Sequence, residues 1–361
     1  MDSLNIESQL ALNHAANAVL KWCTISNDPE IVDIDLVMHQ LSLAISWIQR
    51  VNNGKSQIQN PAEFLALMKK PICEWLPLDL EERLVDGFGV TAFAQDWVAE
   101  HGNESEATLI QEQMLQVMSR LRSRKNGDQL YSRFRENLIS FPVVSIEKAR
   151  EILLPTGLNL TQVFEDIPST CLDKNSTHYF PCPVCYWPMK RHENRVQCSG
   201  SRCFSRGAQF SFVEDRLSPL GDLKAPTPKS ADAMLRLKHG FWRYTLLPGL
   251  IELDLKSRLE QLDGVKVRLW PNLDQYDLLV QISERQLIID VKDWVNTFAL
   301  AKAINNDLNT ENLIYVVPDD RRNQVKILQE NCSSLKHLQF MSVSQLLKAV
   351  KQIITEQEAP F

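Results

Sequence analysis

The sequence lacks any apolar run long enough to cross a lipid bilayer, which takes about 20 consecutive apolar residues. Its first residues, MDSLNIESQL, also lack the basic and apolar regions of a secretion signal. The sequence also contains no internal repeat and no evident DNA-recognition helix, so it does not indicate a DNA target sequence. We therefore expect a cytoplasmic protein that makes no contact with a membrane.

The sequence has no overall excess of positive charge, because its 361 residues carry a net charge of −6. Between positions 186 and 243, however, 11 Lys and Arg residues stand against 5 Asp and Glu residues. A local basic surface beside an acidic remainder suits a polyanion partner at one face of the protein.

A second basic cluster lies in the segment SRLRSRKNGDQLYSRFRE, where Asp128 alone separates the cations. It comprises Arg120, Arg122, Arg124, Lys125, Arg133 and Arg135. This cluster is either a further polyanion-binding surface or a solvated pair of helices that flanks an Asn-Gly-Asp turn.

Cysteine is concentrated in one segment. Four of the eight cysteines have the spacing C-x2-C-x12-C-x4-C, namely Cys182, Cys185, Cys198 and Cys203. Two knuckles with this spacing are typical of a zinc ribbon, in which four thiolates leave no open position and the Zn²⁺ is structural. Because the second pair is widely spaced, His192 is an alternative fourth ligand. The other cysteines (Cys23, Cys73, Cys171 and Cys332) are expected to lie in the core.

Cations and aromatic residues alternate through the cysteine-rich segment. The cations are Lys190, Arg191, Arg195, Arg202 and Arg206, and the aromatic residues are Tyr186, Trp187, Phe204 and Phe210. Such a mixture can contact phosphates and stack on bases. In the alternative reading, the aromatic residues shield the zinc and the cations face water.

The chain is long enough for several units. Apolar residues recur at helical spacing up to about position 150, which predicts a helical domain over 1–150. A connector (151–178), the cysteine module (179–215) and a proline-containing linker (216–232) are expected to follow. The last region, 233–361, has the pattern of an α/β domain. The predicted fold class is therefore a multidomain α+β protein with a mixed C-terminal sheet.

The C-terminal region has a clear order of elements. A helix over 248–262 is followed by three strands, VKVRLW, DLLVQI and QLIIDVK, and then by a helix in VNTFALAKAINNDL. LIYVVP is a continuous apolar run, which is typical of a strand covered on both faces. RNQVKILQEN, LQFMSV and SVSQLLKAVKQIITEQ then predict a helix, a strand and a helix.

Charged residues stand at the ends of two strands of this region. Asp277 opens one strand, and Asp290 and Lys292, two residues apart, share one face of the next. Carboxylates that meet there can hold Mg²⁺, and a neighbouring lysine can orient or deprotonate water or balance charge. Asp274 is better explained as a turn cap, and Asp293 as a solvent contact on the opposite face.

This order of elements, with an aspartate before the second strand and Asp-x-Lys ending the third, resembles the PD-(D/E)XK nuclease superfamily over about 242–343. The resemblance implies that Asp277 and Asp290 bind the catalytic metal together with the Val291 carbonyl, and that Lys292 positions the water. Glu252 matches the place where some members add a further acid. Tyr276 stands where the motif has proline.

More narrowly, the segments LKHGFWRYTLLPGLIELDL, VRLWPNLDQYDL and LIIDVKDW resemble restriction-endonuclease-related proteins encoded beside prokaryotic PIWI-type proteins and DinG-type helicases. The resemblance implies a Mg²⁺-dependent DNA endonuclease in defence against foreign DNA, with a PIWI-type protein and a helicase as partners. The alternatives are a non-catalytic DNA-binding or scaffold subunit and a transcription-related zinc-ribbon protein, although the latter leaves the C-terminal region unexplained.

Overall fold

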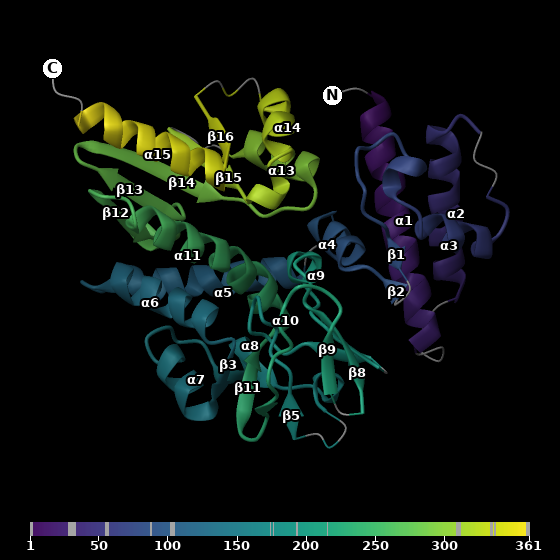
Figure 1. Ribbon diagram of the computed structural model, residues 1–361, viewed down its shortest axis with the longest axis horizontal. Helices are drawn as coiled ribbons and strands as arrows, with labels where there is room; N and C mark the ends of the chain where they lie inside the picture. Colours follow the sequence, from purple (N-terminus) through teal and green to yellow (C-terminus); the bar gives the residue numbers. More distant parts are fainter. Residues whose placement is uncertain are drawn as a thin grey trace. The chain divides into compact units, whose positions relative to one another are not determined.

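The computed structural model describes residues 3–27, 34–54, 58–86, 89–101, 105–173, 175, 177–192, 194–214, 216–307, 312–332, 335 and 337–358. The chain forms two compact units, Met1–Asn103 and Glu104–Phe361. Helices and a mixed sheet are both present, which confirms a mixed α+β composition (Figure 1). None of the helices in these ranges combines the length and the apolar character that a membrane crossing requires.

The first unit is mainly helical. Its elements are α1 (Ser3–Asn27), α2 (Ile34–Val51), α3 (Pro61–Met68), α4 (Ala92–His101) and a two-stranded hairpin of β1 (Val85–Asp86) and β2 (Gly89–Val90). The side chain of Asn60 caps α3 by accepting the Glu63 N–H at 2.9 Å, and Pro61 occupies the first turn. Cys73 is exposed, so its expected place in the core is wrong, and the side chain of Cys23 lies outside the described residues.

The second unit begins with helices that the sequence had placed in the first domain. They are α5 (Ser105–Arg122), α6 (Gly127–Ser140), α7 (Ile146–Leu153) and α8 (Leu160–Val163). Between and after them, β3 (Val143–Ser145) and β4 (Phe164–Asp166) flank β11 (Met234–Leu237) in a three-stranded sheet. The division falls at position 103 instead of 150 because the apolar faces of α5 and α6 pack into the core of the second unit.

The cysteine module is built on a four-stranded antiparallel sheet. Its strands are β6 (Lys190–His192), β7 (Arg195–Gln197), β8 (Gln209–Val213) and β9 (Arg216–Pro219), with α9 (Ser201–Ser205) between β7 and β8. The expected linker (216–232) contains two strands instead of open chain. β9 pairs with β8, and β10 (Lys229–Ser230) pairs with β5 (His178–Tyr179). Backbone hydrogen bonds to existing strand edges therefore order a segment whose composition indicated a linker.

The C-terminal elements follow the predicted order. They are α10 (His239–Phe241), a π-helical turn (Trp242–Leu246), α11 (Leu247–Glu260), β12 (Val265–Leu269), α12 (Pro271–Asp274), β13 (Leu278–Ile282), β14 (Arg285–Val291), α13 (Thr297–Asn306), β15 (Leu313–Val317), α14 (Gln324–Asn331), β16 (Gln339–Ser342) and α15 (Val343–Glu358). The sheet order is β12-β13-β14-β15-β16, with antiparallel pairing up to β14 and parallel pairing beyond it. A mixed sheet is thus confirmed.

Helices cover both faces of this sheet (Figure 1). On one face, Leu255 of α11 and Leu346 of α15 pack with Val280 and Val316. On the other face, Leu300 of α13 and Leu328 of α14 pack with Tyr315. Every residue of β15 is buried, as its continuous apolar run predicted.

The largest core of the second unit joins regions that are distant in sequence. It contains Phe134 and Leu138 of α6, the four clustered cysteines, Trp242 and Trp270. The cysteine module and the helices at the start of the second unit therefore share one core with the start of the C-terminal region.

Candidate functional site

The three charged residues at the strand ends lie together. Asp277 directly precedes β13, and its Oδ2 accepts the backbone N–H of Val291 at 2.7 Å. Nζ of Lys292 is 2.7 Å from Oδ2 of Asp290, as expected for two residues on one face of a strand. The hairpin register, with Leu278 opposite Ile289, brings Asp277 to the end of β14.

Burial and mutual charge shift the ionisation of this group. Burial, Glu252 and Asp290 raise the pKa of Asp277 well above its ordinary value. Burial opposes the charge on Lys292, but Asp290 and Asp277 outweigh it and raise the pKa of the lysine. Lys292 is therefore protonated, which favours charge balance or water orientation over proton abstraction.

Glu252 lies deeper than the other acids, on the buried side of α11, with its side chain 1% exposed. Its carboxylate accepts hydrogen bonds from Arg135 of α6, at 2.9 Å to Oε1 and 3.2 Å to Oε2, and from Nε1 of Trp270. Burial, which the charge of Arg135 opposes, raises the pKa of Glu252. The structure thus places this predicted acid in an arginine-bound environment.

Arg135 is the residue that sequence reasoning missed at this site. It belongs to the second basic cluster, whose other members are exposed, yet its own side chain is buried among carboxylates. A sequence separation of 117 residues from Glu252 hides the pairing. The one available signal was its spacing in α6, where Tyr131, Phe134 and Leu138 define the buried side.

The segment before Asp277 has an unusual backbone. Trp270, Asn272, Leu273 and Asp274 have φ between 48° and 65°, a left-handed region that costs non-glycine residues about 1–2 kcal/mol each. Contacts with α6 hold this turn, because Asp128 accepts the Leu273 N–H at 2.8 Å and Tyr131 donates its hydroxyl to Asp274 at 2.7 Å. Asp274 also pairs with Arg135. This strained turn directly precedes Asp277 and places it beside the end of β14.

Asp293 does not face solvent, so that expectation is wrong. Its side chain is 10% exposed and lies 2.8 Å from Nε of Arg321 and 3.4 Å from Nη1 of Arg202. Arg202 also lies 3.6 Å from Asp320. Two arginines therefore compensate the charge of Asp293, and one of them comes from the short helix α9 of the cysteine module.

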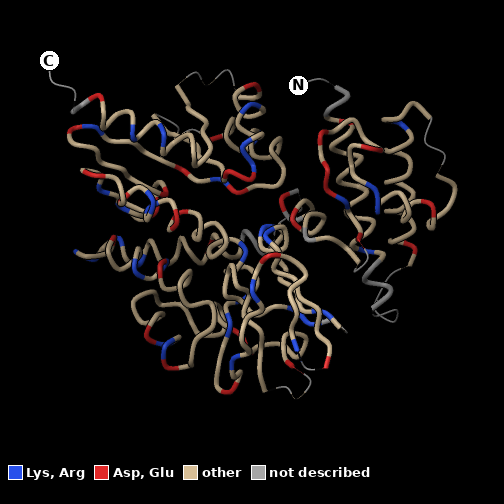
Figure 2. Tube along the Cα trace, viewed as in Figure 1, with Lys and Arg blue, Asp and Glu red and all other residues tan. Residues whose placement is uncertain are grey.

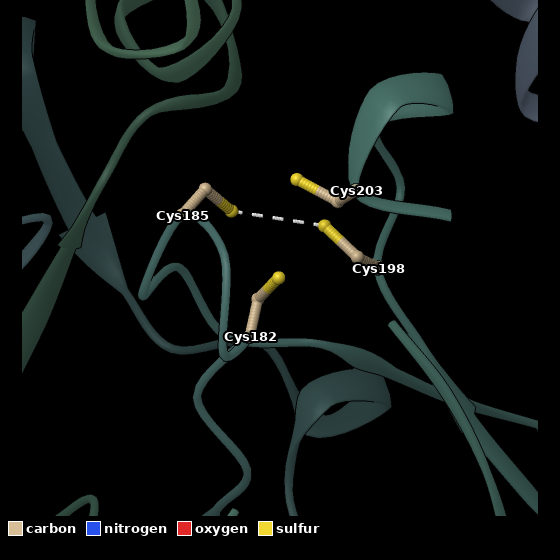
Figure 3. A group of neighbouring side chains, drawn as sticks. All are labelled: Cys182, Cys185, Cys198 and Cys203. Carbon is tan, nitrogen blue, oxygen red and sulfur yellow. Dashed lines mark hydrogen bonds between the residues drawn. The ribbon is translucent and has the colours of Figure 1, made fainter. Parts of the chain in front are cut away.

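The four clustered cysteines converge as their spacing predicts (Figure 3). Their sulfur atoms lie within 4.8 Å of one another, and Cys185 and Cys198 are 3.7 Å apart. Tetrahedral zinc with Zn–S bonds of about 2.3 Å requires sulfur separations of about 3.8 Å, so the cluster fits this ion. The side chain of His192, the alternative ligand, lies outside the described part of the chain.

Tryptophan packs directly against the cluster. Trp242 donates its indole N–H to Sγ of Cys185 at 3.5 Å and stacks on Trp187, with ring centroids 4.5 Å apart. Trp187 and Phe210 are buried, so they pack in the core instead of offering surfaces to bases. Because Trp242 begins the turn that leads into α11, the cysteine cluster supports the helix that carries Glu252.

The cations of the cysteine module differ in exposure. Lys190 and Arg206 are exposed, Arg191 and Arg195 are half-buried, and Arg202 is ion-paired as described above. Figure 2 shows blue Lys and Arg positions along this module and around α9. DNA contact by these five residues stays a prediction.

The C-terminal region is similar to a family of restriction-endonuclease-related proteins. Residues 249–358 match the model of a family described as "REase associating with pPIWI_RE", which confirms the narrower of the two resemblances for this part of the chain. The match spans α11 to α15 without the first two residues of α11, and it includes Glu252, Asp277, Asp290 and Lys292. No curated protein and no solved structure matches the chain significantly.

Proposed function

We propose that the protein is a Mg²⁺-dependent DNA endonuclease with its centre at Asp277, Asp290 and Lys292. The juxtaposition of these three residues at the ends of β13 and β14, within a region related to restriction endonucleases, carries this proposal. Hard carboxylate oxygens suit Mg²⁺, which uses one or two protein carboxylates and keeps several waters.

Each residue has a distinct role in the proposed centre. Asp277 and Asp290, with the Val291 carbonyl, would hold the cation, which when bound polarises the scissile phosphate and activates water. The Val291 N–H fixes the Asp277 carboxylate through its hydrogen bond of 2.7 Å. Lys292 holds a proton and, paired with Asp290, balances charge that develops on the phosphate.

We also propose that the cysteine cluster holds a structural Zn²⁺. All four thiols are buried within the largest core, which leaves no open coordination position for a substrate. Lys190, Arg191, Arg195, Arg202 and Arg206 are proposed to contact DNA phosphates near this module.

The proposed biological role is defence against foreign DNA. The description of the matched family names an association with pPIWI_RE, which supports a PIWI-type partner for this chain. A DinG-type helicase is proposed as a further partner, and the cytoplasm as the place of action.

Mg²⁺-dependent nicking of supercoiled plasmid DNA tests the proposed activity. We expect the purified chain, alone or with its PIWI-type partner, to convert supercoiled into open-circular DNA, and Asp277→Asn to remove this conversion. A non-catalytic DNA-binding subunit is the second candidate, since the basic segment fits DNA without any cleavage. DNA binding with no nicking and no divalent-cation binding in the wild type would favour that candidate.

Divalent-cation affinity is expected to rise with pH. Because the pKa of Asp277 is raised, its carboxyl group keeps its proton to a higher pH than an ordinary aspartate, and a cation must displace that proton. Without a cation, this shift makes the fold less stable as pH rises above the ordinary carboxyl range, and a bound cation offsets the loss. Calorimetry with Mn²⁺ from about pH 5 to about pH 8 should show affinity rising up to about tenfold per unit. A flat profile would contradict proton displacement.

A further inference from the structure

One nitrogen of Arg135 lies between two carboxylates of the proposed centre. Its Nη2 is 2.9 Å from Oε1 of Glu252 and 3.8 Å from Oδ1 of Asp277, and Nη1 pairs with Asp274. The guanidinium therefore bridges the acid of α11 and the acid before β13, so a positive charge already lies between these two carboxylates.

The surroundings hold this guanidinium in its charged form. Arg135 is 8% exposed, and its guanidinium carbon lies 5.0 Å from the ring centroid of Trp270. Burial opposes the charge, but Glu252 and Asp274 outweigh it and raise the pKa of Arg135 well above its ordinary value. The buried Nε has no hydrogen-bond partner, so the position of the side chain is set by its two Nη atoms and the carboxylates.

The charges of the side chains around Arg135 limit how many divalent cations the proposed centre can bind. Four carboxylates, Glu252, Asp274, Asp277 and Asp290, surround two cationic side chains, Arg135 and Lys292. Once a bound cation has displaced the proton of Asp277 and all six groups are ionised, two negative charges are in excess, which one divalent cation neutralises. A second divalent ion would leave the buried group with net positive charge and would displace Arg135 from Glu252.

We propose that the Arg135 guanidinium takes the place of a second metal ion, so that this centre binds a single divalent cation and Glu252 is not a metal ligand. The inference rests on the proposed nuclease function, but it concerns a residue outside the matched region of 249–358. Arg135 is accordingly a positioning residue, because it holds Glu252 and Asp274 and contacts no reacting atom.

Mn²⁺ binding to the zinc-loaded, full-length chain tests this proposal by calorimetry and electron paramagnetic resonance. The wild type should bind one Mn²⁺ per chain, with no signal from coupled ion pairs. Glu252→Gln should keep this stoichiometry and an affinity within about threefold of wild type, since glutamine still accepts a hydrogen bond from Arg135. Two ions in the wild type, or a tenfold weaker affinity in Glu252→Gln, would overturn the proposal.

Removing the guanidinium gives the complementary result. Arg135→Met should bind two Mn²⁺ ions per chain, and the second ion should be lost in Arg135→Met combined with Glu252→Gln. Arg133→Met, a matched change at an exposed position of the same helix, should keep one ion. A folded Arg135→Met variant with one ion would overturn the inference, and if this variant does not fold, the Glu252→Gln result decides. Absence of any Mn²⁺ from the wild type would instead refute the proposed nuclease centre.

Discussion

Replacing Asp290 by Asn is expected to lower the rate of Mg²⁺-dependent DNA cleavage by about a thousandfold or more. Loss of one electrostatic contact in a catalytic centre costs about 10²–10³ in rate, and this substitution also removes a proposed metal ligand. The substitution keeps the size of the side chain but removes the charge that pairs with Lys292 at 2.7 Å. Lys292→Met should produce a loss of similar order, because the charge balance of the proposed centre then fails.

Cleavage rates should be measured at saturating Mg²⁺ on supercoiled and linear DNA. Asp254→Asn is the matched control, because Asp254 lies on α11, its side chain is 64% exposed and its partner is Arg258 within the same helix. The control should retain wild-type cleavage, and all variants should keep the wild-type melting temperature within a few degrees. Normal cleavage by both Asp290→Asn and Lys292→Met would place the active site elsewhere.

Removing zinc is expected to unfold the second unit. Structural zinc contributes about 10–16 kcal/mol in isolated zinc-finger peptides, which equals or exceeds the net stability of about 5–15 kcal/mol typical of a folded domain. Here the four thiols lie in the largest core, beside the stacked pair Trp187 and Trp242. Cys203→Ser and chelation should therefore both remove zinc and abolish near-ultraviolet circular dichroism from these tryptophans.

The zinc prediction has an internal control. Cys73 is exposed and lies in the first unit, so Cys73→Ser should change neither zinc content nor the melting temperature. One zinc per chain is expected in the wild type by elemental analysis. A zinc-free protein that melts at the wild-type temperature would show that the thiol cluster needs no metal for folding.

Local pattern was sufficient for much of the C-terminal region. Apolar alternation and runs located β12 to β16, and three- and four-residue spacing located α11 and α13 to α15, because each element buries one face or both. Alternation along one strand also brought Asp290 and Lys292 to the same face. The cysteine spacing predicted a cluster because two short knuckles place four thiols within reach of one ion.

Long-range contacts could not be read in this way. Arg135 joins Glu252 across 117 residues, and no periodicity links the two. The left-handed turn around Leu273 contains no glycine, which is the residue that usually indicates such a turn in a sequence. A hydrogen bond from the Leu273 N–H to Asp128, 145 residues away, stabilises the turn instead. Asp293 likewise appeared to be a strand-end surface charge because its partners, Arg202 and Arg321, belong to other elements.

The matched region, residues 249–358, does not include all the residues that stabilise it. Arg135 and Trp242 lie outside this region, yet one compensates Glu252 and the other joins α11 to the thiol cluster. A truncated gene for residues 249–358 would encode every proposed catalytic side chain but leave Glu252 and Asp274 without their counter-charge. We therefore expect residues 249–358 expressed alone to be less stable than the same residues joined to α6 and to the cysteine module.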